Sequence, residues 1–159
     1  MGYSSAMQLD ATDWKILREL QRHGRLTNVE LASRVGLSPP PCLRRVQALE
    51  KAGVIAGYRA LLDPSALGFE VTVFAFVGLK SQAEAELRAF TERVAQWPLV
   101  REAYAISGEA DFLLKCVARD LPSLQDFIIR DLTAAPNVEN VKTTLMLRVA
   151  KYEPGVPIT

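Results

Sequence analysis

The residues with the clearest capacity for binding chemistry in this 159-residue chain are two adjacent arginines, Arg44 and Arg45. They follow three consecutive prolines in the stretch GLSPPPCLRRV at positions 36–46. A guanidinium group donates paired hydrogen bonds to phosphate oxygens or to the edge of guanine. Neither arginine has a carboxylate close by in its own helix, since Glu50 is too far along. Contact with a nucleic acid is therefore the chemistry that we expect of the pair.

Catalytic chemistry is poorly supported by comparison. The single histidine, His23, stands beside Gly24 at an expected helix end, where it would complement the helix dipole rather than act as a base. No Cys/His cluster has metal-ligand spacing, and no glycine-rich phosphate loop is present. The two cysteines, Cys42 and Cys116, lie in unlike contexts and are expected to be free thiols in a reducing compartment. We predict that the protein is not an enzyme and needs no cofactor or metal.

Three helices with clear start and stop signals are expected before residue 53. Asp10 is an N-cap candidate with an acidic residue three positions on, and Thr27 has capping-box spacing to Glu30. Gly36 suits the left-handed residue that ends a helix, and Ser38 is the next N-cap candidate. The prolines then occupy the first three helical positions, where a backbone N–H has no intrahelical acceptor to lose.

The third helix is expected to pack through Leu43, Val46 and Leu49 and to leave Arg44 and Arg45 exposed. Two helices around a glycine-containing turn, the second with a basic free face, are typical of a helix-turn-helix that enters the DNA major groove. A plain three-helix packing module with a solvated charged face remains an alternative at this point.

The second half of the chain indicates two βαβ units in tandem. Strands are expected at 71–79, 99–106, 112–118 and 138–150, with helices at 83–97 and 121–132. The order βαββαβ predicts a ferredoxin-like sheet with both helices on one side. The other side would expose Phe74, Phe76 and Met146, so we expect a second copy of the chain to cover it.

Charge and composition agree with a two-part, soluble protein. Residues 1–60 hold nine Lys/Arg and five Asp/Glu, a net +4, whereas residues 61–159 hold ten and thirteen, a net −3. A basic half is expected to face a polyanion. No apolar run is long enough to span a membrane, and no signal-peptide pattern is found, so we expect a cytoplasmic protein without a membrane partner. The expected domains are 1–53 for DNA binding, a hinge at 54–69, and 70–159 for assembly and effector binding.

These motifs together resemble one known family. GRLTNVELASRVGLS, the Pro-Cys-Leu-Arg-Arg run, AGVIAGYRALLD and GEADFLL resemble, in this order and spacing, the Lrp/AsnC (feast/famine) family of bacterial and archaeal regulators. The resemblance covers nearly the whole chain. It implies an α+β fold, with a winged helix-turn-helix joined to a βαββαβ domain. It also implies dimers that assemble into octamers, double-stranded DNA as a partner, and control of transcription by an amino acid or related small molecule.

Site residues are implied by the same resemblance. For DNA they are Arg25, Thr27, Ser38, Pro40, Cys42, Arg44 and Arg45. For the effector they are Tyr104, Ser107, Gly108, Glu109, Asp111 and Thr133, around the turn between the second and third strands. Backbone amides of this turn would hold an α-carboxylate, and Asp111 an α-ammonium.

Simpler interpretations stay open for some of these residues. The SGEAD stretch could be only a hairpin turn, Ser38 only a cap, and Cys42 only a packing residue. The alternative function is a stand-alone amino-acid-binding oligomer that has no role on DNA.

Overall fold

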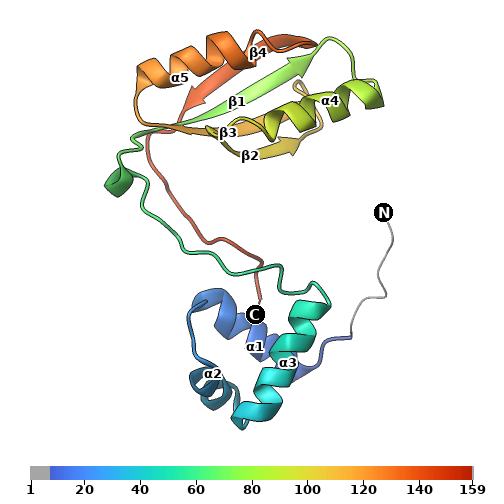
Figure 1. The fold of residues 1–159 in the computed structure, drawn as a ribbon, viewed down its shortest axis with the longest axis vertical. Helices are drawn as coiled ribbons and strands as arrows, with labels where there is room; N and C mark the ends of the chain where they lie inside the picture. Colours follow the sequence, from blue (N-terminus) through green and yellow to red (C-terminus); the bar gives the residue numbers. More distant parts are fainter. Residues whose placement is uncertain (1–7, 159) are drawn as a thin grey trace. The chain divides into compact units, whose positions relative to one another are not determined.

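The computed structural model describes residues 8–158, which form two compact units (Figure 1). The first unit comprises the chain through Leu61 together with the segment from Tyr152 onward, and the second is Leu62–Lys151. The segment from Tyr152 onward thus clusters with the first unit, whereas the expected C-terminal domain is 70–159; the expected domain bounds stay predictions. Within residues 8–158, no helix is both long enough and apolar enough to cross a membrane.

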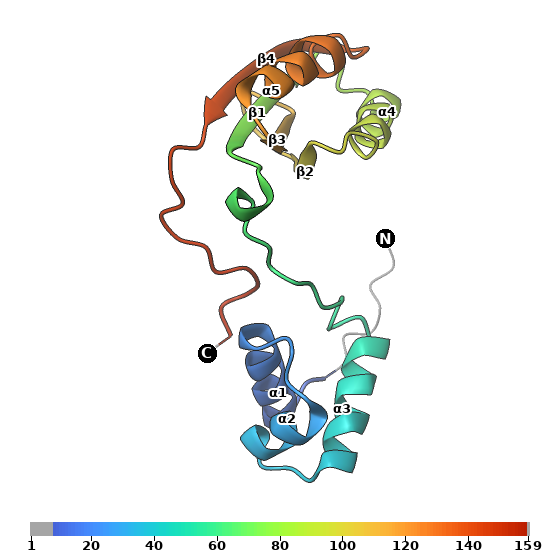
Figure 2. The ribbon, with the colours of Figure 1, turned by 60° about the vertical axis from the view of Figure 1, so that its left-hand side comes forward.

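Three helices build the first unit, α1 (Ala11–Arg22), α2 (Asn28–Val35) and α3 (Pro39–Lys51) (Figure 2). Asp10 caps α1 and Thr27 caps α2, each in a reciprocal capping box, as the sequence predicts. Gly36 ends α2 in the left-handed conformation at φ 76°. The helices enclose a small core that includes Ile16, Leu31, Cys42 and Leu49.

The start of α3 explains the three prolines. They fill the first positions of the helix after Ser38, which takes the N-cap position but makes no capping hydrogen bond with its side chain. The reason is that a proline has no N–H, so the Ser38 hydroxyl finds no donor at the usual capping positions. The first backbone bond of the helix runs from the Cys42 N–H to the Ser38 carbonyl, 3.3 Å.

The expected hinge at 54–69 contains no strand, and none is assigned among the described residues between α3 and the sheet of the second unit. A single 3-10 turn, η1 (Ser65–Leu67), precedes the sheet, and Gly68 ends it at φ 75°.

The second unit is a four-stranded antiparallel sheet with helices on one side (Figure 1). Its strands are β1 (Val71–Leu79), β2 (Val100–Ala105), β3 (Phe112–Ala118) and β4 (Val138–Leu145), in the order β2-β3-β1-β4. Between them lie α4 (Glu84–Val94), α5 (Leu121–Phe127) and a π-helical turn, η2 (Ile128–Leu132). This is the predicted βαββαβ arrangement.

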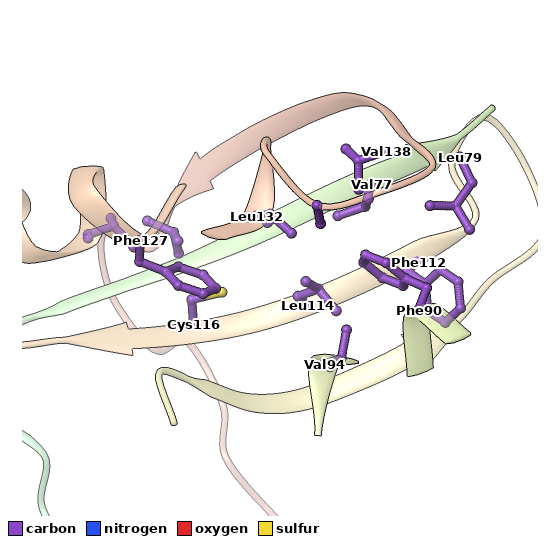
Figure 3. Close-up of a cluster of buried hydrophobic side chains, with 14 of the residues drawn as sticks. Val77, Leu79, Phe90, Val94, Phe112, Leu114, Cys116, Phe127, Leu132 and Val138 are labelled. Carbon is purple, nitrogen blue, oxygen red and sulfur yellow. The ribbon is translucent and has the colours of Figure 1, made fainter. Parts of the chain in front are cut away.

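The core of the second unit lies between the sheet and its helices (Figure 3). Alternate residues of β3, Phe112, Leu114 and Cys116, are buried against Phe90 of α4 and Phe127 of α5. Phe90 contacts Phe112 with ring centroids 4.8 Å apart. The alternation of residues that predicted this strand from the sequence thus matches the alternation of buried and partly buried side chains along β3.

The opposite side of the sheet, which we term the open face, consists of Phe74, Phe76, Tyr104, Leu113 and Lys115 with their neighbours. Phe76 is 37% exposed and Tyr104 52%. The last strand ends at Leu145 rather than at residue 150, and the Met146 N–H makes one further bond to the Thr72 carbonyl, 2.9 Å. That a second copy covers the open face stays a prediction.

Candidate nucleic-acid interface and effector turn

The orientation of α3 differs from the expected one by a single residue. Cys42 and Leu49 are fully buried, whereas Leu43, expected in the core, is 44% exposed. The inward face therefore runs through positions 42, 45, 46 and 49, which share one side of a helix. The sequence offers two neighbouring apolar residues, Cys42 and Leu43, and the packed one is the cysteine. This rotation decides which arginine faces inward.

Arg45 is only partly exposed and is tied to the start of α1. Its Nη1 lies 2.7 Å from Oδ2 of Asp10 and 2.8 Å from Oδ1 of Asp13, at the start of α1. The hydrogen bond that Arg45 donates to Asp13 is the main cause that raises the pKa of Arg45, followed by the one that it donates to Asp10. Asp13 is 4% exposed, so removal of the guanidinium would leave a buried carboxylate without its cation. Arg45 has no carboxylate partner within α3, as expected, but it has two at the start of α1. A contact of Arg45 with DNA stays a prediction.

Arg44 has the opposite environment. Its side chain is exposed, and within the part of the chain that the structure describes it forms no ion pair. The helix turns by about 100° per residue, which places the two adjacent guanidinium groups on different sides of α3. Of the two, Arg44 is the one available to an anionic partner.

The tip of α3 presents further polar and apolar groups. Ser38 and Pro40 are exposed, and the Ser38 hydroxyl is not used as a cap. Asn28 of α2 steadies this tip, because its Nδ2 donates to the Pro39 carbonyl at 2.8 Å. The sequence analysis missed Asn28, since nothing local marks a bond to a residue eleven positions away.

Two other residues expected at the DNA backbone lie at the start of α2. Arg25 is exposed. Thr27 is exposed too, but its hydroxyl already donates to Oε2 of Glu30 at 2.8 Å and accepts from the Glu30 N–H at 3.2 Å. Cys42, by contrast, is 0% exposed and cannot contact DNA in this structure. Burial raises the pKa of its thiol. The buried position favours the packing interpretation of Cys42.

The SGEAD stretch connects β2 to β3, as expected. Ser107, Gly108 and Glu109 are exposed, with Gly108 at φ 131°. Asp111 is partly buried and ties the turn to β1. Its Oδ2 accepts from the Leu79 N–H at 2.6 Å and its own N–H donates to the Val77 carbonyl at 2.9 Å. Asp111 thus has a structural role, as the hairpin-turn interpretation allowed, although the sequence did not indicate its partner Leu79 on β1.

A second loop is fixed next to this turn by side-chain amides. Asn137, at φ 66°, accepts from the Ser81 N–H and donates to the Ser81 carbonyl, at 3.0 and 2.9 Å. Gln82 donates to Oδ2 of Asp111 at 3.5 Å. The end of β1, the SGEAD turn and the loop before β4 therefore meet at one end of the sheet. Ser81, Gln82 and Asn137 were not expected here, because their partners are 29 or 56 residues away.

Tyr104 and Thr133 complete the set expected for an effector. Thr133 is exposed at the end of η2. Tyr104 projects from the open face, where its hydroxyl donates to Oε2 of Glu102 at 2.9 Å. Lys115 donates to Oε1 of the same glutamate at 2.7 Å, and this bond is the main cause that lowers the pKa of Glu102. Among residues 8–158, no cluster suited to a metal ion is found.

A capped helix-turn-helix and a βαββαβ unit with structured loops at one end define a two-part class of regulator, and comparison with known proteins agrees. Residues 9–56 match the model for winged helix-turn-helix DNA-binding domains, and residues 72–156 match the Lrp/AsnC ligand-binding domain. The chain belongs to the Lrp/AsnC family of transcriptional regulators, as its motifs indicated. These proteins are regulators and not enzymes.

Similar proteins span most of the chain. The leucine-responsive regulatory protein of Rhizobium meliloti is 63% identical over 91% of this chain and 93% of its own length. The transcriptional regulator AzlB of Bacillus subtilis is 36% identical over 96% and 97%. A crystal structure of a transcriptional regulator from Neisseria meningitidis in complex with L-Met is 38% identical, with a TM-score of 0.90 over 94% of this chain and 97% of that one.

Proposed function

We propose that this protein is a sequence-specific DNA-binding transcriptional regulator that acts as a homo-oligomer and responds to a free amino acid. The carrying observation is the division of labour on α3. Arg45 and Cys42 fix the helix to the rest of the first unit, whereas Arg44, Ser38 and Pro40 remain on its exposed side and tip. Readout of a DNA major groove requires a rigid helix whose N-terminal end has exposed groups that can contact the bases. A cytoplasmic location follows from such a role.

The amino-acid response is supported by the loops at one end of the sheet. Asp111 uses one carboxylate oxygen, Oδ2, for the β1 backbone, which leaves Oδ1 for an α-ammonium group. The exposed amides of Ser107–Glu109 are suited to an α-carboxylate. The L-Met complex of the Neisseria relative supports a mid-sized apolar amino acid, such as methionine or leucine.

A mobility-shift titration tests the DNA step. The probe is DNA from upstream of the gene that encodes the chain, with excess unrelated DNA as competitor and with salt varied from about 50 to 200 mM. We expect a specific complex that weakens steeply with salt. Absence of any specific, salt-dependent complex would contradict the DNA function and leave the stand-alone amino-acid-binding oligomer as the better description.

A further inference from the structure

The last residues of the chain bind the first helix of the same unit. We term residues Tyr152–Ile158 the C-terminal tail. Nε2 of Gln21, near the end of α1, donates to the Val156 carbonyl at 2.7 Å, and the Val156 N–H donates back to Oε1 of Gln21 at 3.1 Å. One side-chain amide thereby pairs with both backbone groups of a residue 135 positions away. A neighbouring β-strand would make the same pair of bonds.

Apolar contact adds to this pairing. Ile158 is partly buried and packs against the core of the three helices. The Val156 side chain is 61% exposed, so position 156 is recognised through its backbone and position 158 through its side chain. Pro154 precedes these contacts and Pro157 lies between them, and both prolines lower the entropy that the tail loses on docking.

Gly155 shows that the fit is close. Its φ of +111° lies in the region that favours glycine. A Cβ at this position would also collide with the Gln21 amide, at 2.6 Å from Cδ. Any side chain at position 155 would therefore displace the group that holds Val156.

We propose that the C-terminal tail is a clasp that binds α1 of its own chain and joins the two units by a second connection. The first connection is the chain that leaves the helical unit after Leu61, and the second is the chain that returns at Tyr152. Two connections leave the helical unit less orientational freedom than one connection. Because part of this freedom is already lost in the free protein, less conformational entropy is lost when DNA binds. The clasp therefore raises DNA affinity, a step that rests on the proposed DNA function.

Hydrogen exchange measured by mass spectrometry on the full-length chain tests the docking itself. We expect the tail peptide to exchange about tenfold faster in Gln21→Ala, in Ile158→Asp and in Gly155→Ala than in the wild type. Val156→Thr is the matched control, since it keeps both backbone bonds and should exchange like the wild type. Equal exchange of the tail in wild type and Gln21→Ala would overturn the clasp.

A photo-crosslinker distinguishes a clasp in the same chain from a tail exchanged between copies. p-Benzoylphenylalanine replaces the exposed Val156 in a sample refolded from mixed light and heavy isotope-labelled chains. Crosslinked peptides that join the tail to α1 should carry a single isotope. A mixture of light and heavy partners in these peptides would show that the tail binds a second copy, against the proposal.

DNA affinity is then compared among the same variants. Gln21→Ala should weaken binding about three- to tenfold, because the helical unit must be ordered at the moment of binding. Val156→Thr should bind like the wild type. Unchanged affinity in Gln21→Ala would contradict the coupling. Failure of the wild type to bind DNA would instead contradict the proposed function, while the exchange experiment would still decide the clasp.

Discussion

At the scale of single residues, Arg44 and Arg45 show how one helical step separates two roles. We predict that Arg44→Ala weakens DNA binding by about 10- to 100-fold and leaves the melting temperature unchanged, because its guanidinium has no intramolecular partner among the described residues. Titration of the same DNA probe and calorimetry of the free protein measure the two effects.

For Arg45→Ala we expect the opposite result, a lower melting temperature as the main effect and not a loss of DNA affinity. It leaves the buried Asp13 unpaired, so we expect the melting temperature to fall by several degrees. Asp13→Asn removes the other member of the ion pair. It should also lower the melting temperature, although Arg45 itself is retained on α3. If Arg45→Ala kept the wild-type melting temperature and lost only DNA affinity, the structural role of Arg45 would be wrong.

The two cysteine thiols, Cys42 and Cys116, are both buried. Burial raises the pKa of Cys116 to about 11, and Cys42 is equally inaccessible. We expect neither thiol to react with iodoacetamide at about pH 8 in the native protein, because the thiolate is the reactive form and access is blocked. Both should react once urea unfolds the chain. Mass spectrometry counts the adducts. Rapid modification of Cys42 in the native protein would show that Cys42 lies on the exposed side of α3, against this prediction.

At the scale of elements, the cap of α1 links stability to pH. The backbone N–H of Asp13, and next the Arg45 side chain, hold the pKa of Asp10 below its ordinary 3.8. A lowered folded pKa means that the charged form is the stabilising one. Its contribution is therefore complete above about pH 4 and is lost as the pH falls through the lowered value.

Asp10→Asn tests this linkage, because asparagine keeps the cap but not the charge. We expect the melting temperature of the wild type to fall more steeply than that of the variant between about pH 4 and pH 2. Near pH 7 the variant should be the less stable protein, since it lacks the ion pair to Arg45. Parallel pH profiles for the two proteins would show that Asp10 titrates normally.

The SGEAD turn, Ser107–Asp111, is the proposed site for the amino acid. Asp111→Asn retains an oxygen that can accept from the Leu79 N–H but removes the negative charge. We predict that methionine or leucine raises the melting temperature of the wild type and that Asp111→Asn loses this response by about tenfold or more in affinity, as expected for loss of a charged hydrogen bond. Glu109→Gln, at an exposed position of the same turn, is the control for charge alone.

The variant's own melting temperature separates ligand binding from folding. It should stay close to that of the wild type if the Leu79 bond survives. No shift with any of the twenty amino acids would contradict the effector proposal, and an equal shift in the variant would remove Asp111 from it.

The elements that the sequence predicted best are those with local causes. The capping residues Asp10 and Thr27, the left-handed Gly36 and the alternation of β3 all depend on neighbours within a few positions. What escaped prediction depends on distant partners. Arg45 meets Asp13 across 32 positions, Asp111 meets Leu79 across 32, and Val156 meets Gln21 across 135. Pattern alone also could not choose between Cys42 and Leu43 as the packed residue of α3.

At the scale of the whole molecule, we propose that the chains assemble through the open face of the sheet. Phe74 and Phe76 lie on it, and two of its charged residues, Lys115 and Glu102, pair at 2.7 Å. Lys142 of β4, which is opposite Phe76 in the strand register, is exposed on the same face. The exposed aromatic residues of this face are suited to burial against an identical surface across a two-fold axis, provided that Lys142 lies at the edge of the contact. Assembly of such dimers into octamers remains a proposal that rests on family resemblance.

Light scattering tests whether the open face is covered by a second copy. The wild type should have a mass of at least twice 17.6 kDa at micromolar concentration. We expect Phe76→Asp to shift the protein toward monomer, because association would bury an unpaired carboxylate at the centre of the face. Leu121→Asp, at an exposed apolar residue at the start of α5, is the control and should keep the wild-type mass. Circular dichroism establishes that Phe76→Asp remains folded; a folded variant that still assembled like the wild type, or a monomeric wild type, would show that the open face is not the dimer interface.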